Sequence, residues 1–221
     1  INGFFFMKER KVTKIQVQKK NPNRVNIFLD EEFAFGLSRV VAAWLKVGDV
    51  ISDEKITRLK QEDEYETAMQ RALHFLGYRP RSEHEVRARL AENEYDAAVI
   101  EKVIERLREL KYVGDLEFAR QWIENRSTFR PRGSRALAAE LKQKGVEEKT
   151  IEQALMEMPE EEKLALEAAR RYSARLQGLD RKAFRMRLGG FLGRRGFGFE
   201  IIYKVVDEIW QDLQSEDAQY S

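Results

Sequence analysis

The feature that most constrains the fold of this chain is an internal repeat. Leu90, Leu141 and Leu192 stand at equal intervals, since 141 − 90 and 192 − 141 are both 51. Apolar residues recur five, ten, fourteen and seventeen positions after each leucine: Tyr95, Val146 and Phe197; Ile100, Ile151 and Ile202; Ile104, Leu155 and Val206; Leu107, Met158 and Ile209. A fixed period with one apolar skeleton indicates a supersecondary unit used three times, and stacked units of this kind usually serve as a binding surface.

Each repeat is predicted to contain three helices. Helical spacing of apolar residues begins at Tyr65 and ends before Arg79-Pro80, because proline cannot continue a helix and restricts the residue before it. Ser82 with Glu85 three residues later is a capping box for a second helix, and a third helix begins near Asp96. The later repeats restate this order, so we expect a mainly α chain.

The turn after the second helix has a conformational signature. Gly145 and Gly196 occupy the same repeat position, where a helix C-terminus favours a residue that tolerates positive φ. The first repeat has Glu94 at that position.

A small β-hairpin and helix module is predicted before the array. Two alternating segments lie on either side of Asn21, Pro22 and Asn23, and their apolar residues are Val12, Ile15 and Val17, then Val25, Ile27 and Leu29. Phe33, Phe35 and Leu37 extend the pairing, and a short apolar helix over residues 38–46 stops at Gly48. The module either caps the open end of the array or makes contacts of its own, and the residues leave both readings open.

Composition excludes several classes of protein. The chain has no cysteine, so it has neither disulfides nor thiolate metal sites. It has no apolar stretch of about 18 residues, and its first residues do not resemble a signal peptide. We therefore expect a soluble, untargeted, cytoplasmic protein with no membrane partner, and Met7 is a candidate initiator after a short leading extension.

Basic charge is concentrated in the third repeat although the formal net charge is only +2. Residues 170–195 hold nine Arg or Lys and one acid, Asp180. One basic position also recurs in register, eleven residues before each anchor leucine, as Arg79, Arg130 and Arg181. Arginine binds carboxylates and phosphates through forked hydrogen bonds, so this position suits a periodic anionic partner. The alternative is that these arginines cap helix C-termini or pair with nearby acids.

Catalysis and cofactor binding have little support. His74 and His84 are ten residues apart with Pro80 between them, which does not place them as metal ligands on one helical face. The glycine-rich segment around Arg194 and Arg195 lacks the ending of a phosphate-binding loop and is equally consistent with a solvated turn. Trp122, Tyr172 and Trp210 fall on apolar helix faces and are expected in the core. We expect neither an enzyme nor a metal or cofactor site.

The segment RPRSEHEVRARL, its partner RPRGSRALAAEL, and the step from Tyr112-Val113-Gly114-Asp115 into Phe118-Ala119 resemble the RecX family of RecA regulators. The resemblance covers about residues 65–210, and the N-terminal hairpin is similar to an extension that some members carry. This chain departs from the usual pattern at Glu94, where members typically have glycine, and at Val113-Gly114-Asp115, where they often have two acids.

The resemblance implies an elongated, curved array of three-helix repeats that binds in the groove of the RecA filament and modulates, most often inhibits, RecA. Expected partners are the RecA filament and, as an alternative, single- or double-stranded DNA bound by the basic third repeat of a monomer. The candidate partner-binding residues are Arg79, Arg81, Arg87, Arg130, Arg132, Arg135, Lys142, Lys144, Arg181, Lys182, Arg185, Arg187, Arg194 and Arg195. The expected domains are residues 1–62 for the N-terminal module, and 63–113, 114–160 and 161–215 for the repeats.

Overall fold

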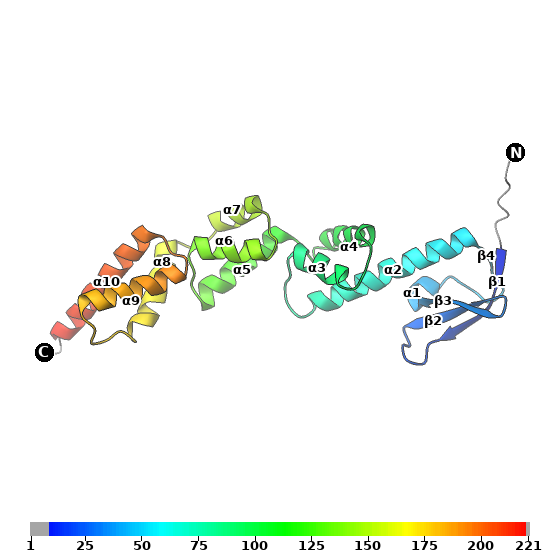
Figure 1. Cartoon of the computed structure of the whole chain (residues 1–221), viewed down its shortest axis with the longest axis horizontal. Helices are drawn as coiled ribbons and strands as arrows, with labels where there is room; N and C mark the ends of the chain where they lie inside the picture. Colours follow the sequence, from blue (N-terminus) through cyan, green and yellow to red (C-terminus); the bar gives the residue numbers. More distant parts are fainter. Residues whose placement is uncertain (1–8, 220–221) are drawn as a thin grey trace. The chain divides into compact units, whose positions relative to one another are not determined.

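A computed structural model describes residues 9–219, with side chains through residue 215. Met7, the candidate initiator, lies outside the described residues. The elements are, in chain order, β1 Glu9–Val17, β2 Arg24–Leu29, β3 Glu32–Ser38, α1 Arg39–Ala42, β4 Val50–Ser52, α2 Asp53–Leu76, α3 Glu83–Ala91, α4 Ala97–Glu109, α5 Asp115–Phe129, α6 Ser134–Gln143, α7 Glu148–Met156, α8 Glu161–Ser173, α9 Arg181–Arg194 and α10 Phe199–Gln219 (Figure 1). The predicted mainly α array of three three-helix repeats after a small β module is confirmed.

The N-terminal strands form an antiparallel sheet in the order β3-β2-β1-β4. The hairpin register pairs Ile15 with Ile27 and Val17 with Val25, and the second hairpin pairs Ile27 with Phe35. One face of the sheet is apolar and packs with the first turns of α2 around Ile56 and Leu59. The hairpin and its extension were predicted, whereas β4 was not.

Helix α2 begins earlier than its sequence pattern indicates. Helical spacing is evident only from Tyr65, but the helix starts at Asp53, and the Ser52 hydroxyl accepts the Lys55 N–H at its N-terminus. The first part of α2 is mostly charged, so it has too few apolar residues for a helical pattern to be recognised in the sequence. This part of the helix is stabilised by tertiary contacts, because Ile56 and Leu59 are buried against the sheet.

Helix α1 is shorter than expected. The apolar segment 38–46 predicted a helix up to Gly48, but α1 covers only Arg39–Ala42. Ala42 and Leu45 enter the core, while Trp44 is 90% exposed. The apolar composition of this segment therefore predicted a longer helix than the structure has.

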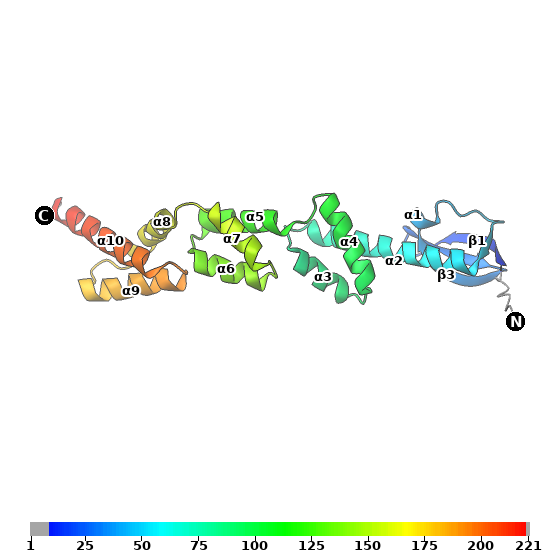
Figure 2. The same ribbon diagram turned by 90° about the horizontal axis from the view of Figure 1, so that it is seen from above.

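The repeat skeleton forms the core of each three-helix unit. Leu90, Leu141 and Leu192 are fully buried. In the second repeat α5 and α6 pack on α7, and in the third repeat α10 packs on α8 and α9 (Figure 2). Trp122 and Trp210 are half-buried against these cores, as expected.

The second helix of every repeat ends in the same way. The amide five residues after each anchor leucine donates to the leucine carbonyl, at 3.5 Å for Tyr95, 3.1 Å for Val146 and 3.3 Å for Phe197. The residue before that amide has positive φ in all three repeats. This is the Schellman arrangement that the glycine positions predict.

The chain divides into two compact units. One contains the residues up to Arg79 together with Val86–Leu110, and the other contains Pro80–Glu85 together with the residues from Lys111 on. Helix α2 runs without a break through the expected boundary at residues 62 and 63. The expected domain limits stay predictions.

Candidate functional site

The residues before α6 and those that end α9 meet through a defined joint within the second unit. The Gly133 N–H donates to the Arg195 carbonyl at 2.9 Å, and Arg195 Nη1 donates back to the Pro131 carbonyl at 2.9 Å. A Cβ on Gly133 would lie 2.4 Å from the Gly196 carbonyl oxygen, so the joint requires glycine there. One of these hydrogen bonds holds the Arg195 backbone, and the other holds its guanidinium.

The same joint recurs one repeat earlier with different atoms. Ser82 stands 51 residues before Gly133, and Lys144 stands 51 residues before Arg195. The Ser82 hydroxyl donates to the Lys144 carbonyl at 2.5 Å. Residues at equal repeat positions therefore recur in similar surroundings.

Arg195 helps to form a basic aromatic pocket that we call the α8–α9 pocket. Its volume is about 210 Å³, and its lining residues are Phe129, Pro131, Ala168, Arg171, Tyr172, Arg175, Phe191 and Arg195. The Tyr172 and Phe191 rings stack in parallel with centroids 4.0 Å apart, and the Arg195 guanidinium lies 4.6 Å from the Phe191 centroid. Phe129, the last residue of α5, is 69% exposed.

Positive charge is crowded around this pocket. Burial lowers the pKa of Arg195, and the neighbouring charges of Arg132, Arg130 and Arg171 lower it further. Arg132 pairs with Glu140 at 2.6 Å, a carboxylate that it shares with Arg126, and Arg171 pairs with Glu167. Arg130, Arg175 and Arg195 have no ion pair within the described part of the chain, which leaves the pocket suited to an anion.

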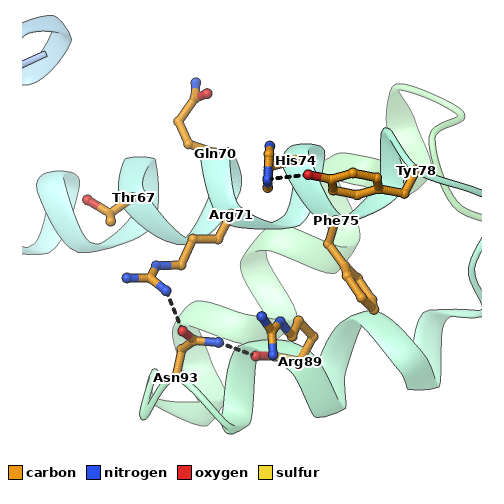
Figure 3. A pocket seen from close by; sticks show the side chains of 8 residues that line it. All are labelled: Thr67, Gln70, Arg71, His74, Phe75, Tyr78, Arg89 and Asn93. Carbon is orange, nitrogen blue, oxygen red and sulfur yellow. Dashed lines mark hydrogen bonds between the residues drawn. The ribbon is translucent and has the colours of Figure 1, made fainter.

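A second groove lies in the first unit between α2 and α3. Its volume is about 460 Å³, and Figure 3 shows its lining residues, Thr67, Gln70, Arg71, His74, Phe75, Tyr78, Arg89 and Asn93. His74 and Tyr78 are joined by a 3.1 Å hydrogen bond, and Arg71 donates to the Asn93 side-chain oxygen. Tyr78 is 72% exposed and occupies the same repeat position as Phe129.

Several predicted binding residues are engaged with acids. Arg87 makes a forked pair with Glu101, at 2.8 and 3.1 Å, and this hydrogen bonding lowers the pKa of Glu101. The other pairs are Arg81–Glu85 at 3.8 Å, Lys144–Glu85 at 2.9 Å, Arg132–Glu140 at 2.6 Å, and Arg181 and Arg185 with Asp207 at 3.7 and 3.6 Å. Among the in-register arginines, Arg181 thus has the acidic neighbour that the pairing alternative predicts.

The remaining predicted residues have different surroundings. Arg79 is half-buried and engaged in an interaction within the molecule. Arg195 lies in the turn after α9, and its side chain is half-buried and lines the α8–α9 pocket. Exposed side chains without an ion pair in residues 9–215 are those of Arg130, Arg135, Lys142, Lys182, Arg187 and Arg194.

The sequence reasoning missed Phe129, Arg171 and Arg175. The 51-residue period contained a signal for Phe129, because it places one aromatic residue, Tyr78 or Phe129, directly before each Arg-Pro pair. Arg171 and Arg175 lie in the basic segment, but their approach to Phe129 depends on how α8 packs against the end of α5.

His74 shares a hydrogen bond with Tyr78. His84 is exposed, and its ring lies where a Cβ on Gly145 would be. Within the described residues, no group of His, Cys, Asp and Glu side chains gathers as a metal site requires. Among residues 9–219, no helix combines the length and apolar character that a membrane span needs.

Comparison with known proteins assigns a family to this architecture. Models of the regulatory protein RecX N-terminal domain and of the first, second and third RecX three-helix domains match residues 10–52, 68–107, 115–155 and 160–206. The chain is 36% identical to regulatory protein RecX of Bacillus pumilus over 94% of this chain and 81% of that protein, and 35% identical to that of Bacillus subtilis over 90% and 76%.

Solved structures show the same architecture. A crystal structure of regulatory protein RecX superposes with a TM-score of 0.70 at 25% identity, covering 90% of this chain and 99% of that one. The crystal structure of RecX from Lactobacillus salivarius is similar in fold, with a TM-score of 0.61 at 20% identity over 66% of this chain and 97% of that one. The four domain matches, the relatives and the shared architecture together show that this chain belongs to the RecX family of regulatory proteins.

Proposed function

We propose that this protein binds the RecA nucleoprotein filament and inhibits its recombinase, ATPase and co-protease activities in DNA repair and the SOS response. It acts as a cytoplasmic monomer that contacts several RecA subunits. The observation that carries the proposal is a joint that recurs: it links the residues before α3 to the end of α6, and the residues before α6 to the end of α9. In successive repeats the equivalent residues Arg130 and Arg181 are both exposed, which suits a partner that is itself periodic and anionic.

The test measures RecA ATP hydrolysis on single-stranded DNA with substoichiometric amounts of this protein. We expect inhibition even at these amounts, because each molecule of this protein would occupy several RecA subunits. No change under any order of addition would contradict the proposal.

Variants refine this test. Arg130→Glu and Arg135→Glu reverse exposed charges without breaking an ion pair in the described part of the chain, so they should weaken inhibition without unfolding the protein. Lys149→Glu, an exposed reversal on α7, is the matched control. Arg132 is unsuitable, because its reversal would also expose Glu140 to a like charge.

A second candidate function is sequence-independent DNA binding through the third repeat. This function is favoured because few acids pair with the basic segment of the third repeat. Glu167 pairs with Arg171, and Glu208 is 4.0 Å from Arg170. Asp207 lies near both Arg181 and Arg185. Exposed Arg175, Lys182, Arg187 and Arg194 have no ion pair in residues 9–215. Affinity for single strands should fall with salt, with a log-log slope of about −0.7 per contacted phosphate. A flat response, or binding that requires RecA, would reject this candidate.

A further inference from the structure

We propose that the α8–α9 pocket binds one nucleotide of a single-stranded nucleic acid, with the phosphate on its arginines and the base against Phe129. This inference deepens the second candidate function and rests on it. DNA binding would then use a defined pocket that contacts the base, in addition to general electrostatic attraction between the basic segment and the phosphates.

Positive charge at the pocket has few acids to balance it. Arg175 and Arg195 line the pocket, Arg130 lies near Arg195, and none of the three has an ion pair in the described residues. Burial depresses the pKa of Arg195, and the neighbouring guanidinium charges, including that of Arg130, depress it further. Such crowding is unfavourable in an empty site and is relieved when an anion enters. Guanidinium groups match phosphate oxygens through paired hydrogen bonds.

The Arg195 side chain is held in place by its neighbours. Arg195 donates to the Pro131 carbonyl, lies on the Phe191 ring, and accepts the Gly133 N–H at its own carbonyl. Its guanidinium is therefore oriented before any ligand arrives, which lowers the entropic cost of binding. Free surface arginines lack this preorganisation.

The pocket is small for a ligand site. A volume of about 210 Å³ is below the roughly 300–1,000 Å³ of pockets that enclose a whole small molecule. The pocket suits one group of a polymer that continues across the surface. Exposed Arg130 follows Phe129 directly and offers a contact to an adjacent phosphate.

The aromatic edge of the pocket favours a nucleotide over an acidic peptide. A carboxylate would need only the guanidinium groups, whereas Phe129 places an exposed ring at the edge of the pocket. Aromatic rings beside arginines are typical of surfaces that stack the bases of single strands. The aromatic residue also recurs, since Tyr78 at the same repeat position lines its own groove with Arg71 and Arg89 (Figure 3).

The experiment measures fluorescence anisotropy of an oligodeoxythymidylate and of an abasic strand of equal length, with the full chain and no RecA. Phe129→Leu should weaken binding of oligodeoxythymidylate at least about fivefold, because base–aromatic stacking is lost, and should leave the salt slope and abasic binding unchanged. Arg175→Gln should weaken both strands and reduce the slope by about 0.7.

Two matched controls locate the effect. Phe199→Leu removes an exposed ring outside the pocket, so it should leave binding unchanged. Arg187→Gln removes an exposed charge outside the pocket lining, so it should leave the preference for oligodeoxythymidylate over the abasic strand unchanged. Circular dichroism and Tm verify that each variant is folded.

The outcomes separate the two ideas. If the unaltered protein binds neither strand, the second candidate function fails and this inference fails with it. If it binds both strands equally and Phe129→Leu changes nothing, the pocket assignment is overturned while DNA binding stands. If polyglutamate competes, and its binding rather than that of DNA depends on Phe129 and Arg175, the pocket is a site for acidic peptides and the inference is wrong.

Discussion

The backbone at the end of each second helix shows how one residue position is constrained in two ways. The φ angle is 62° at Glu94, 76° at Gly145 and 85° at Gly196, a region that L residues with a Cβ adopt at a cost. A Cβ on Gly196 would also lie 2.5 Å from the Ala136 backbone nitrogen, and one on Gly145 would overlap the His84 ring. Glycine is therefore required twice over in the later repeats, whereas in the first repeat only the angle favours it.

Substitution at these positions should have opposite signs. Gly196→Ala should destabilise the protein by more than about 2 kcal/mol, because it adds a backbone clash to a left-handed strain of roughly 1–2 kcal/mol. Glu94→Gly should stabilise it by up to about 1 kcal/mol by removing that strain. Urea unfolding of both variants checks this, and equal effects at the two positions would contradict it.

The contribution of the Arg87–Glu101 pair to stability should depend on pH. Hydrogen bonding to Arg87 lowers the folded-state pKa of Glu101, so the pair's contribution is present above the unfolded value of about 4.3 and is lost as pH falls through the folded pKa. Because Glu101 is exposed, Glu101→Gln should cost only about 0.2–1 kcal/mol at pH 7 and progressively less toward pH 3. Denaturant unfolding at both pH values tests this, with Glu105→Gln on the same helix as the control. A cost that grows in acid would refute it.

At the scale of elements, some helix starts can be predicted from the sequence and others cannot. The Ser82 and Glu85 capping box is formed as predicted, with the Ser82 N–H donating to Glu85 Oε2 at 3.3 Å and the Glu85 N–H donating to Ser82 Oγ at 3.2 Å. Local residues suffice for this start. The start of α2 at Asp53 depends on burial against the sheet, which no local pattern specifies.

Ser82 should matter more than an ordinary helix cap. Ser82→Ala removes the cap and also leaves the Lys144 carbonyl without its hydroxyl donor in a buried position, so we expect a loss of about 2–3 kcal/mol. Ser52→Ala is the control, because the Ser52 side chain caps only the Lys55 N–H, and about 1 kcal/mol is expected. Thermal or urea unfolding compares them. Similar losses would show that the bond to Lys144 adds little.

At the scale of the whole molecule, each of the two compact units has its own apolar core. In the first unit the sheet is tied to α2 by a polar contact as well as by the core. Asp63 is 8% exposed, accepts the Ser38 N–H at 2.5 Å, and pairs with Arg24 at 2.7 Å. Separate cores favour local unfolding of one unit without the other.

Loss of the contact between Asp63, Ser38 and Arg24 should destabilise the first unit and leave the second unit unchanged. Asp63→Ala should destabilise the first unit by roughly 3–5 kcal/mol, because it leaves Arg24 half-buried without its acid and the Ser38 N–H without an acceptor. Asp53→Ala, which breaks an exposed pair with Arg10, should cost less than about 1 kcal/mol. Hydrogen exchange should show faster opening of residues 24–37 and no change in residues 184–206. Equal acceleration in both segments would mean that the units unfold together.

The sequence by itself determined the repeat, the helical class, the hairpin, the capping box and the positions that need positive φ, because these depend on periodicity and on local backbone chemistry. It also located the basic segment. Only the tertiary structure decided which arginines are already paired with acids, such as Arg87 and Arg132, and which remain available, such as Arg130 and Arg175. Ion pairing and pocket formation join residues from different helices, so they depend on distances that a linear pattern does not contain.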